Sequence, residues 1–393
     1  MPSADLADWS RYRRAIRGET MPLALVDLDA LEANVAHLVR AADGKPIRLA
    51  TKSVRAPALM RHIVDAANGA IHGVMAFSGL ECPALRAAGF EDIVVAYPTV
   101  QPAELDAIVH ANASGARAAL VVDCEEHVDA IAAVSRDADV RVPIIVDVDV
   151  ALRPFAGLHI GVRRSPLREA SDVVALAARV AARRELQFDG IMAYEAHVAG
   201  VPDDSIAVRA MKRLARRRVE SARSAIVSAL RASGLSPRLV NGGGTGSVRA
   251  NAAEKTLTEI TVGSGFLASH LFDRYDGLAL RPAAFFAVAV SRRPEARIVT
   301  CAGGGWIASG PPSKDRSPRP WLPPGLELIG LEGAGEVQTP LRVPSGIELA
   351  IGEPVLFRHA KAGELAEHVR EILLVRGDAI VGRSLTYRGL DHG

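Results

Sequence analysis

Apolar and polar positions alternate in a regular rhythm from Ile47 onward. Short apolar runs, typical of buried strands, are each followed by a longer stretch whose apolar residues recur at the spacing of a helix face. The expected strands are residues 47–51, 71–77, 93–97, 118–122, 142–148, 188–194, 237–240 and 257–262, and the expected helices are 57–67, 80–88, one from about 102, 125–134, 171–183 and 208–232. Eight such units predict parallel strands joined by right-handed crossovers, and therefore a closed (β/α)8 barrel of the TIM type.

A further apolar run, at residues 23–28, precedes the barrel rhythm. It is followed by an expected helix at residues 30–42, in which Leu31, Val35, Leu38 and Val39 fall on one stripe. Asp29, directly before this helix, is the expected N-cap. Because the strand is left over from the barrel count, we expect it to join a second domain.

The composition and hydrophobic pattern of the sequence change after about Pro282. Proline and glycine become frequent, and the apolar runs have the lengths of strands bounded by turns. Strands are expected at residues 284–291, 297–301, 326–331, 354–358, 371–375 and 379–383, and a turn at 331–338. The pattern predicts an all-β domain at 282–393 beside a barrel domain at 22–281, with the strand at 22–28 joining the two.

Composition and charge narrow the classes of function. The chain has 393 residues, of which 49% are hydrophobic and 23% charged, enough for two globular domains. The formal net charge of +2 gives no reason to expect a nucleic acid or an anionic membrane as partner. Three scattered cysteines without a CxxC motif predict a reducing compartment and no structural zinc. Without a signal peptide or a membrane-spanning run, we expect a cytoplasmic protein that acts on a small molecule.

A single lysine, Lys52, stands where the first barrel strand ends. Barrel enzymes keep their chemistry at the carboxyl ends of the strands, so this amine is expected in the mouth of the barrel. A partly desolvated lysine there can form a Schiff base with an aldehyde cofactor. The alternative is a surface lysine that merely closes a strand.

Two glycine-rich turns follow the last two expected barrel strands. The first contains Gly243, Gly244, Thr245 and Gly246, and the second contains Gly263 and Ser264. Turns at these two places often bind phosphate in barrels, because glycine lets backbone N–H groups approach the phosphate oxygens. The alternative is that the glycines only form tight turns.

Three more side chains are candidates for contact with a cofactor. Tyr194 ends the sixth expected strand and could touch a cofactor ring or donate a proton, although a core tyrosine is an equal alternative. His159 and Arg163 follow the fifth strand and could face a ring nitrogen or a phenolic oxygen. For Arg163 and its neighbour Arg164, the alternative is exposure on the surface.

The β domain carries a cluster of charged and imidazole side chains. His359 and Lys361 stand two apart at an expected strand end, so their side chains should share a face. Histidine and glutamate could bind a divalent metal there, but an ammonium repels a cation. A cluster that recognises a charged substrate is therefore at least as consistent. The other members of the cluster are Glu364, Glu367 and His368.

Taken in order, these motifs resemble the fold-type III pyridoxal phosphate (PLP) enzymes. The resemblance covers about residues 22–383 and is closer to the D-threonine aldolase and D-serine dehydratase family, including its deaminase/aldolase-like subgroup, than to alanine racemase. The motifs that carry it are Val26-Asp27-Leu28-Asp29-Ala30-Leu31, Ala50-Thr51-Lys52-Ser53, Ala193-Tyr194, Gly243-Gly244-Thr245-Gly246 and Gly263-Ser264.

The resemblance implies roles for individual residues. Lys52 would hold PLP as a Schiff base, the two glycine turns would bind its phosphate, and Tyr194 would lie in the active site. The family's usual metal pair is a histidine followed two residues later by aspartate or cysteine. Here His359 is followed by Lys361, which leaves a divalent metal, manganese or zinc, open. An arginine usually stands where this chain has His159.

The resemblance also implies a reaction class. The leading hypothesis is a PLP-dependent lyase that cleaves the Cα–Cβ bond of β-hydroxy D-amino acids, as an aldolase, or eliminates water from them. Lys52 and Tyr194 would be catalytic, together with His359 or Lys361. The alternatives are an amino acid racemase, and a PLP-carrier protein without turnover. A homodimer is expected from the fold.

Overall fold

The computed structural model describes residues 4–153, 155, 157–311 and 313–390. Contacts divide the chain into two compact units. Unit 1 comprises residues 1–37, 53–66 and 264–393, and unit 2 comprises residues 38–52 and 67–263. The sequence-based boundaries at 22–281 and 282–393 stay a prediction.

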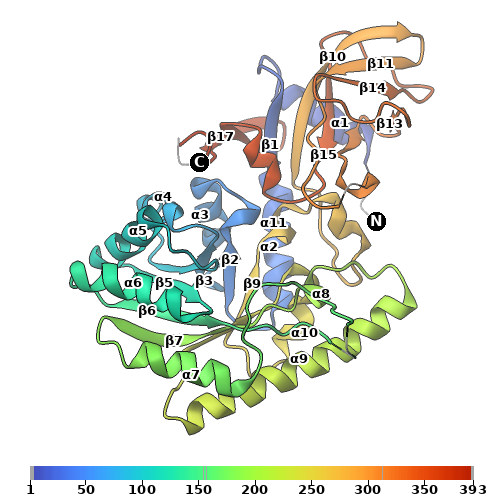
Figure 1. The fold of residues 1–393 in the computed structure, drawn as a ribbon. Helices are drawn as coiled ribbons and strands as arrows, with labels where there is room; N and C mark the ends of the chain where they lie inside the picture. Colours follow the sequence, from blue (N-terminus) through green and yellow to red (C-terminus); the bar gives the residue numbers. More distant parts are fainter. Residues whose placement is uncertain (1–3, 154, 156, 312, 391–393) are drawn as a thin grey trace. The chain divides into compact units, whose positions relative to one another are not determined.

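Unit 2 contains the barrel. Its eight strands pair in chain order and close, and every pair in the ring is parallel (Figure 1). They are β2 (Ile47–Ala50), β3 (Ile71–Ala76), β4 (Asp92–Val95), β5 (Arg117–Val122), β6 (Val142–Asp147), β7 (Leu186–Met192), β8 (Leu239–Gly242) and β9 (Glu259–Val262). The predicted (β/α)8 barrel is confirmed.

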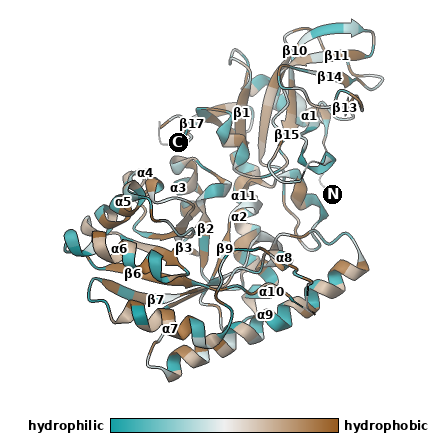
Figure 2. Cartoon of the chain, in the orientation of Figure 1, coloured by the Kyte–Doolittle hydropathy of each residue, from teal (hydrophilic) through white to brown (hydrophobic). Residues whose placement is uncertain are grey.

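Helices surround this barrel on the outside (Figure 1). They are α4 (Cys82–Ala87), α5 (Pro102–Ala113), α6 (Glu125–Asp137), α7 (Ala170–Ala181), α8 (Ala196–Ala199), α9 (Ile206–Ala232) and α10 (Val248–Ala252). In α9 the buried residues Ala215, Val219 and Leu230 share one face, and the nearby Arg217 is exposed. Figure 2 shows the same division, with apolar strands β6 and β7 beside helices that carry hydrophilic residues.

The interior of the barrel combines an apolar cluster with one buried ion-pair network. Val94, Val121 and Ile145 belong to the apolar cluster. Arg48, 1% exposed, binds both carboxylate oxygens of Glu259 at 2.6 and 2.9 Å. It also binds Asp92 at 2.8 Å, so a single guanidinium on β2 connects β9 with β4.

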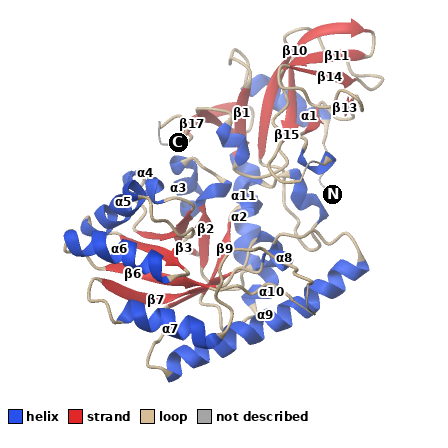
Figure 3. Cartoon of the chain, viewed as in Figure 1, coloured by secondary structure: helices blue, strands red, loops and turns tan. Residues whose placement is uncertain are grey.

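Unit 1 contains a nine-stranded sheet (Figure 3). The strands are β1 (Leu23–Asp27), β10 (Ala284–Glu295), β11 (Ile298–Ala302), β12 (Arg319–Leu322), β13 (Glu327–Leu328), β14 (Gln338–Arg342), β15 (Pro354–Arg358), β16 (Glu371–Arg376) and β17 (Ala379–Leu385). The order β13-β14-β11-β10-β1-β16-β17 forms the main path, and β15 joins β10 to β12. The strand expected at 23–28 is thus β1, an interior strand antiparallel to β10 and parallel to β16.

Short helices complete unit 1, and one predicted cap is wrong. The helices are α1 (Leu6–Ala15), α2 (Leu28–Ala41), which crosses into unit 2, α3 (Pro57–Ala66) and α11 (Ser264–Leu267). Helix α2 begins two residues earlier than expected, and Asp27, not Asp29, accepts the hydrogen bond from Ala30 N, at 2.9 Å. Asp29 instead pairs with Arg376 on the surface.

Two strands of unit 1 were not predicted. β12 and β14 contain Pro320 and Pro340, and proline argues against a strand because it cannot donate to the ladder. The strand expected at 326–331 shortens to Glu327–Leu328, and β14 begins at Gln338, where the expected turn ends. The remaining expected strands of this region are confirmed.

Candidate functional site

Lys52 lies in a short 3-10 turn, Thr51–Ser53, that follows β2 at the carboxyl end of the barrel. Its ammonium Nζ donates to the hydroxyl of Tyr97 at 3.0 Å and lies 5.6 Å from the centre of that ring. Tyr97 stands two residues beyond β4, two strands further round the barrel. Tyr97 was not among the predicted site residues, although it ends an expected strand, as Tyr194 does.

The rings of Tyr194 and Tyr97 both lie near the guanidinium of Arg164. The guanidinium carbon of Arg164 lies 5.6 Å from the ring centre of Tyr97 and 5.8 Å from that of Tyr194. Burial, together with the charge of Glu195, raises the pKa of Tyr194 to about 12, so its hydroxyl stays protonated at neutral pH. Tyr194 is therefore suited to donate a hydrogen bond.

The loop after β6 places its basic residues differently from expectation. Arg163 and Arg164 are both exposed, as the surface alternative predicted, and the guanidinium of Arg164 reaches the two tyrosines. His159 accepts a hydrogen bond from Arg153 at 3.2 Å, and its Nε2 lies 3.0 Å from the carbonyl of Val162. Contacts of His159 and Arg163 with a cofactor stay predictions, whereas Arg164 joins the tyrosines beside Lys52.

The first glycine turn is fixed by one buried carboxylate. Glu195, 1% exposed, accepts hydrogen bonds from Gly243 N at 3.1 Å, Ser247 Oγ at 3.1 Å and Asn251 Nδ2 at 2.7 Å. It also forms an ion pair with Arg223. Burial opposes its ionisation, but Arg223 and these donors outweigh burial and lower the pKa of Glu195. A buried carboxylate that stays charged therefore fixes the conformation of this turn through its hydrogen bonds.

Two of the glycines in this turn are required sterically. Gly243 has a φ of +83°, and a Cβ there would lie 2.6 Å from Ile260 and 2.7 Å from Asn251. A Cβ on Gly244 would lie 2.9 Å from that of Ala199. The backbone at these two positions therefore packs too closely against its neighbours to leave room for side chains, and its N–H groups bind Glu195 and Ser247.

The second glycine turn follows β9. Gly263 is buried, and Ser264 opens α11 with its Oγ 3.2 Å from that of Ser53. Ser53 itself comes directly after Lys52 in the sequence. Phosphate binding by these residues stays a prediction.

A buried carboxylate lies close to Tyr194. Asp147, the last residue of β6, lines a small cavity together with Arg164 and Tyr194. Burial raises its pKa to about 7, the charge of Asp123 adds to this rise, and Arg164 opposes it. Nothing in the local sequence marks Asp147, because its environment arises from neighbouring strands.

His359 and Lys361 line one small cavity of unit 1, with Glu364, His368 and Trp306. His359 is 4% exposed, and burial, then the charges of Arg358 and His270, lowers its pKa to about 3. Lys361 Nζ donates to Ser309 Oγ at 2.8 Å and lies 3.2 Å from Glu364. His359 is thus a neutral imidazole, and Lys361 is an ion-paired cation.

Among the described residues, this cluster forms no group of three metal ligands, and a metal at His359 stays a prediction. Within the described chain, neither ring nitrogen of His359 makes a hydrogen bond of ordinary geometry. The backbone of Ala284 raises the pKa of His359 slightly, but burial outweighs this effect. His359, Glu364 and His368 bring no three ligand atoms together. Glu364 is already bound by Ser309 and Lys361, and His368 stacks on Trp306 at 4.6 Å.

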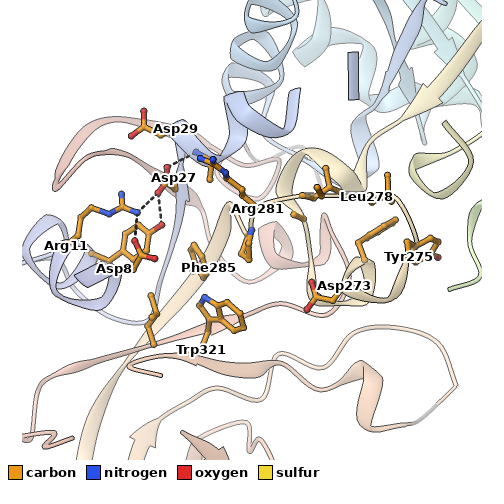
Figure 4. A pocket seen from close by; sticks show the side chains of 18 of the residues that line it. Asp8, Arg11, Asp27, Asp29, Asp273, Tyr275, Leu278, Arg281, Phe285 and Trp321 are labelled. Carbon is orange, nitrogen blue, oxygen red and sulfur yellow. Dashed lines mark hydrogen bonds and ion pairs between the residues drawn. The ribbon is translucent and has the colours of Figure 1, made fainter. Parts of the chain in front are cut away.

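A larger cavity, about 830 Å³, lies elsewhere in unit 1. Figure 4 shows Asp8 and Arg11 on one side of it and Asp273 and Tyr275 on the other. Its wall includes Asp27, which accepts hydrogen bonds from Arg11 and Tyr12. None of the predicted site residues lines this cavity.

A closed barrel with a lysine after its first strand and a glycine turn after each of its last two defines a class of barrel proteins suited to a phosphorylated cofactor. The sequence profile of the alanine racemase N-terminal domain matches residues 26–267. The chain belongs to this family, which is PLP-dependent.

Curated relatives are named as aldolases. The chain is 27% identical to a 3-hydroxy-D-aspartate aldolase of Paracoccus denitrificans (strain Pd 1222) over 62% of this chain and 59% of the relative. It is 26% identical to a D-threonine aldolase of an Arthrobacter species over 72% of this chain and 71% of the relative. The match to the first of these thus spans under two thirds of the relative's length.

Solved structures share the fold over nearly the whole chain. The D-threonine aldolase from Filomicrobium marinum superposes with a TM-score of 0.81 at 21% identity, covering 99% of this chain and 98% of that one. The D-threo-3-hydroxyaspartate dehydratase from Delftia sp. HT23 superposes with a TM-score of 0.78 at 18% identity, covering 95% of this chain and 98% of that one.

None of the helices in the described part of the chain has both the length and the apolar character of a membrane span.

Proposed function

We propose that this protein is a PLP-dependent lyase that acts on β-hydroxy D-amino acids, by retro-aldol cleavage or by dehydration. The observation that carries the proposal is the position of Lys52, directly after the first barrel strand and hydrogen-bonded to Tyr97. The names of the relatives, aldolases of 3-hydroxy-D-aspartate and D-threonine, supply the substrate class.

The residues that follow the barrel strands fit PLP. Lys52 would carry the cofactor on Nζ, Tyr194 and Arg164 would face it, and the turn from Gly243 to Gly246 would bind its phosphate. The N–H groups of Gly243 and Gly244 already bind Glu195 and Ser247, so the phosphate would take its donors from Thr245 and Gly246. The turn of Gly263 and Ser264 would add further phosphate contacts. Bound PLP would supply an electron sink for bond cleavage at the substrate's Cα.

The protein's own side chains would position the reacting groups. Tyr97 orients the amine of Lys52, which would move the proton at the substrate's Cα. Tyr194, protonated at neutral pH, would donate a hydrogen bond. Either His359 or Lys361 would engage the carboxylate or the β-hydroxyl of the substrate.

We further propose that catalysis does not depend on manganese or zinc at His359. The residue that would supply a second ligand is Lys361, whose ammonium already pairs with Glu364 and repels a cation. Activity should therefore survive chelation and dialysis unchanged. A requirement of the wild type for stoichiometric manganese or zinc, with the metal content lost in His359→Ala, would overturn this proposal.

An absorbance spectrum of the purified protein, incubated with PLP, tests the cofactor. We expect a visible band that borohydride bleaches while fixing the cofactor to the Lys52 peptide, and no band in Lys52→Ala. Lys45→Ala, a second barrel lysine whose Nζ binds backbone carbonyls, is the control and should keep the band. If wild type shows no band, the proposal fails.

A substrate panel then separates the reactions. D-threonine and 3-hydroxy-D-aspartate should yield glycine and an aldehyde if the enzyme is an aldolase, or ammonia and a keto acid if it is a dehydratase. Deuterium uptake at Cα without loss of amino acid would instead identify a racemase. A homodimer and a cytoplasmic location stay predictions, the first checked by light scattering.

A further inference from the structure

Three metal-binding side chain types meet at the carboxyl end of β5. Asp123 directly follows the strand, Cys124 is the N-cap of α6, and His127 lies in the first turn of that helix. One ligand atom from each lies within 4.8 Å of the others, and all three residues are half-buried. Within the described chain, they are the group of three such side chains whose ligand atoms lie this close together.

The spacing of the three residues explains why they converge. Cys124 and His127 are three apart across the start of a helix, so they lie on one side of it. His127 Nδ1 is 3.0 Å from Asp123 Oδ1 and 3.2 Å from Cys124 Sγ. Because the carboxylate and the thiol face the same ring nitrogen, the histidine cannot relay a proton between them through its two nitrogens, as in a hydrolase triad.

We propose that Asp123, Cys124 and His127 bind a divalent transition metal of the zinc class. Carboxylate, thiolate and imidazole are the ligands that zinc takes in proteins. At ordinary bond lengths around a tetrahedral zinc, the nitrogen would lie about 3.4 Å from the oxygen and about 3.6 Å from the sulfur. The observed separations differ from these by a few tenths of an ångström, within the reach of small side-chain rotations.

Metal binding at this site is a simple exchange of a proton for a cation. The S–H bond of Cys124 breaks, a sulfur–metal bond forms, and the proton leaves to solvent. His127 coordinates as the neutral ring through Nδ1 and keeps its proton on Nε2. Three protein ligands leave one position for water or another small ligand, as in catalytic zinc sites.

The charges around the site favour a cation. Asp147, the buried carboxylate at the end of the adjacent strand β6, interacts electrostatically with Asp123. Glu125 and Glu126 add two carboxylates in the first turn of α6. The amino end of α6 repels a cation, and burial raises the pKa of the Cys124 thiol, so a bound metal has to displace its proton against both effects. All three residues belong to unit 2, whereas His359 belongs to unit 1.

Cobalt(II) titration of the full-length holoenzyme, followed by difference spectra against the same sample without cobalt, tests the proposal. We expect a sulfur-to-cobalt charge-transfer band in the near ultraviolet that saturates at one equivalent. Cys124→Ser should abolish the band, and His127→Ala should weaken cobalt binding at least about tenfold, the loss caused by even an outer-shell change. Release of one proton per cobalt, measured in weak buffer, should accompany the band.

Two matched variants locate the metal. Cys301→Ser alters a buried cysteine outside the cluster, and His359→Ala alters the other candidate ligand, so both should keep the band. The proposal is overturned if wild type shows no band, or if the band persists in Cys124→Ser. Circular dichroism of the metal-free variants separates loss of a ligand from loss of the fold.

Discussion

At the scale of single residues, Glu195 is the group that connects the candidate catalytic tyrosine with the phosphate turn. It follows Tyr194 in the chain and accepts hydrogen bonds from Gly243, Ser247 and Asn251. Its partner Arg223, 1% exposed, also pairs with Glu254. Since every one of these groups is buried, each depends on the others for its hydrogen bonds.

Glu195→Gln should therefore weaken cofactor binding. The amide replaces one of the two carboxylate oxygens with an NH2 group, so either Gly243 N–H or the Asn251 amide loses its acceptor, and leaving such a buried group unsatisfied costs about 1–3 kcal/mol. We expect the dissociation constant for PLP to rise about tenfold or more, measured by equilibrium dialysis. Glu254→Gln also disturbs Arg223 but does not contact the turn, so it is the matched control. Equal effects of the two variants on PLP affinity would contradict the positioning role.

Arg164 and Arg163 form a second matched pair. Arg164→Lys removes an exposed planar guanidinium lying near Tyr97 and Tyr194, a type of contact that contributes about 0.5–1 kcal/mol. We expect kcat/KM to fall about two- to fivefold, with a shift in the absorption maximum of the bound cofactor. Arg163→Lys, at the neighbouring position, which is also exposed, should change neither. If Arg163→Lys has the larger effect on kcat/KM and on the absorption maximum, Arg163 and not Arg164 contacts the cofactor.

At the scale of elements, the barrel is closed on its amino-terminal side by charge as well as by packing. Arg48 on β2 connects β9 and β4 through Glu259 and Asp92. Gly73 on the neighbouring β3 makes room for this side chain, because a Cβ there would lie 2.6 Å from the guanidinium. The strands at the point of closure therefore share one buried cation.

Glu259→Gln should destabilise the barrel strongly. It leaves the guanidinium of Arg48 buried with Asp92 as its remaining carboxylate, and breaking a buried pair costs about 3–5 kcal/mol. The free energy of unfolding, followed by circular dichroism in urea, measures the loss. Asp65→Asn breaks an exposed pair with Arg61 and should cost below about 0.5 kcal/mol. A similar small loss for both variants would show that the buried network contributes little.

At the scale of the whole molecule, buried histidines make unit 1 sensitive to acid. Burial lowers the pKa of His270 to about 4 and that of His359 to about 3, from an ordinary value of 6.5. The unfolded chain binds these protons below about pH 6.5, whereas the folded chain does not. Stability is therefore lost as the pH falls from about 6.5 toward 4, by up to about 1.4 kcal/mol per pH unit for each histidine.

His270→Gln should reduce this acid sensitivity. Between pH 7 and pH 5 we expect the loss of unfolding free energy to be smaller than in wild type, by about 2 kcal/mol. All three tryptophans, Trp9, Trp306 and Trp321, belong to unit 1, so tryptophan fluorescence in urea follows this unit. His72→Gln, at an exposed position, should leave the wild-type pH dependence unchanged. If His270→Gln also leaves it unchanged, His270 is not its source.

The barrel could be predicted from the sequence because each strand is a local apolar run with turn signals on both sides. The family was predictable because short ordered motifs, such as the one around Lys52, carry it. What could not be predicted depends on contacts between distant segments. Arg164 rather than Arg163 meets the tyrosines because of how one loop folds, and the role of Glu195 depends on Arg223, on another helix.

Unit 1 is built from three separate segments of the chain, and this affects how it folds during synthesis on the ribosome. Leu25 of β1 pairs with Phe285 on one side and with Leu373 on the other. At about 5–20 residues per second, translation therefore leaves this apolar strand without its second neighbour for roughly 20 to 70 s. The barrel strands, by contrast, are complete once Val262 has emerged. A nascent chain of this protein thus holds a finished barrel and an unpaired, aggregation-prone strand at the same time, the state that chaperones bind.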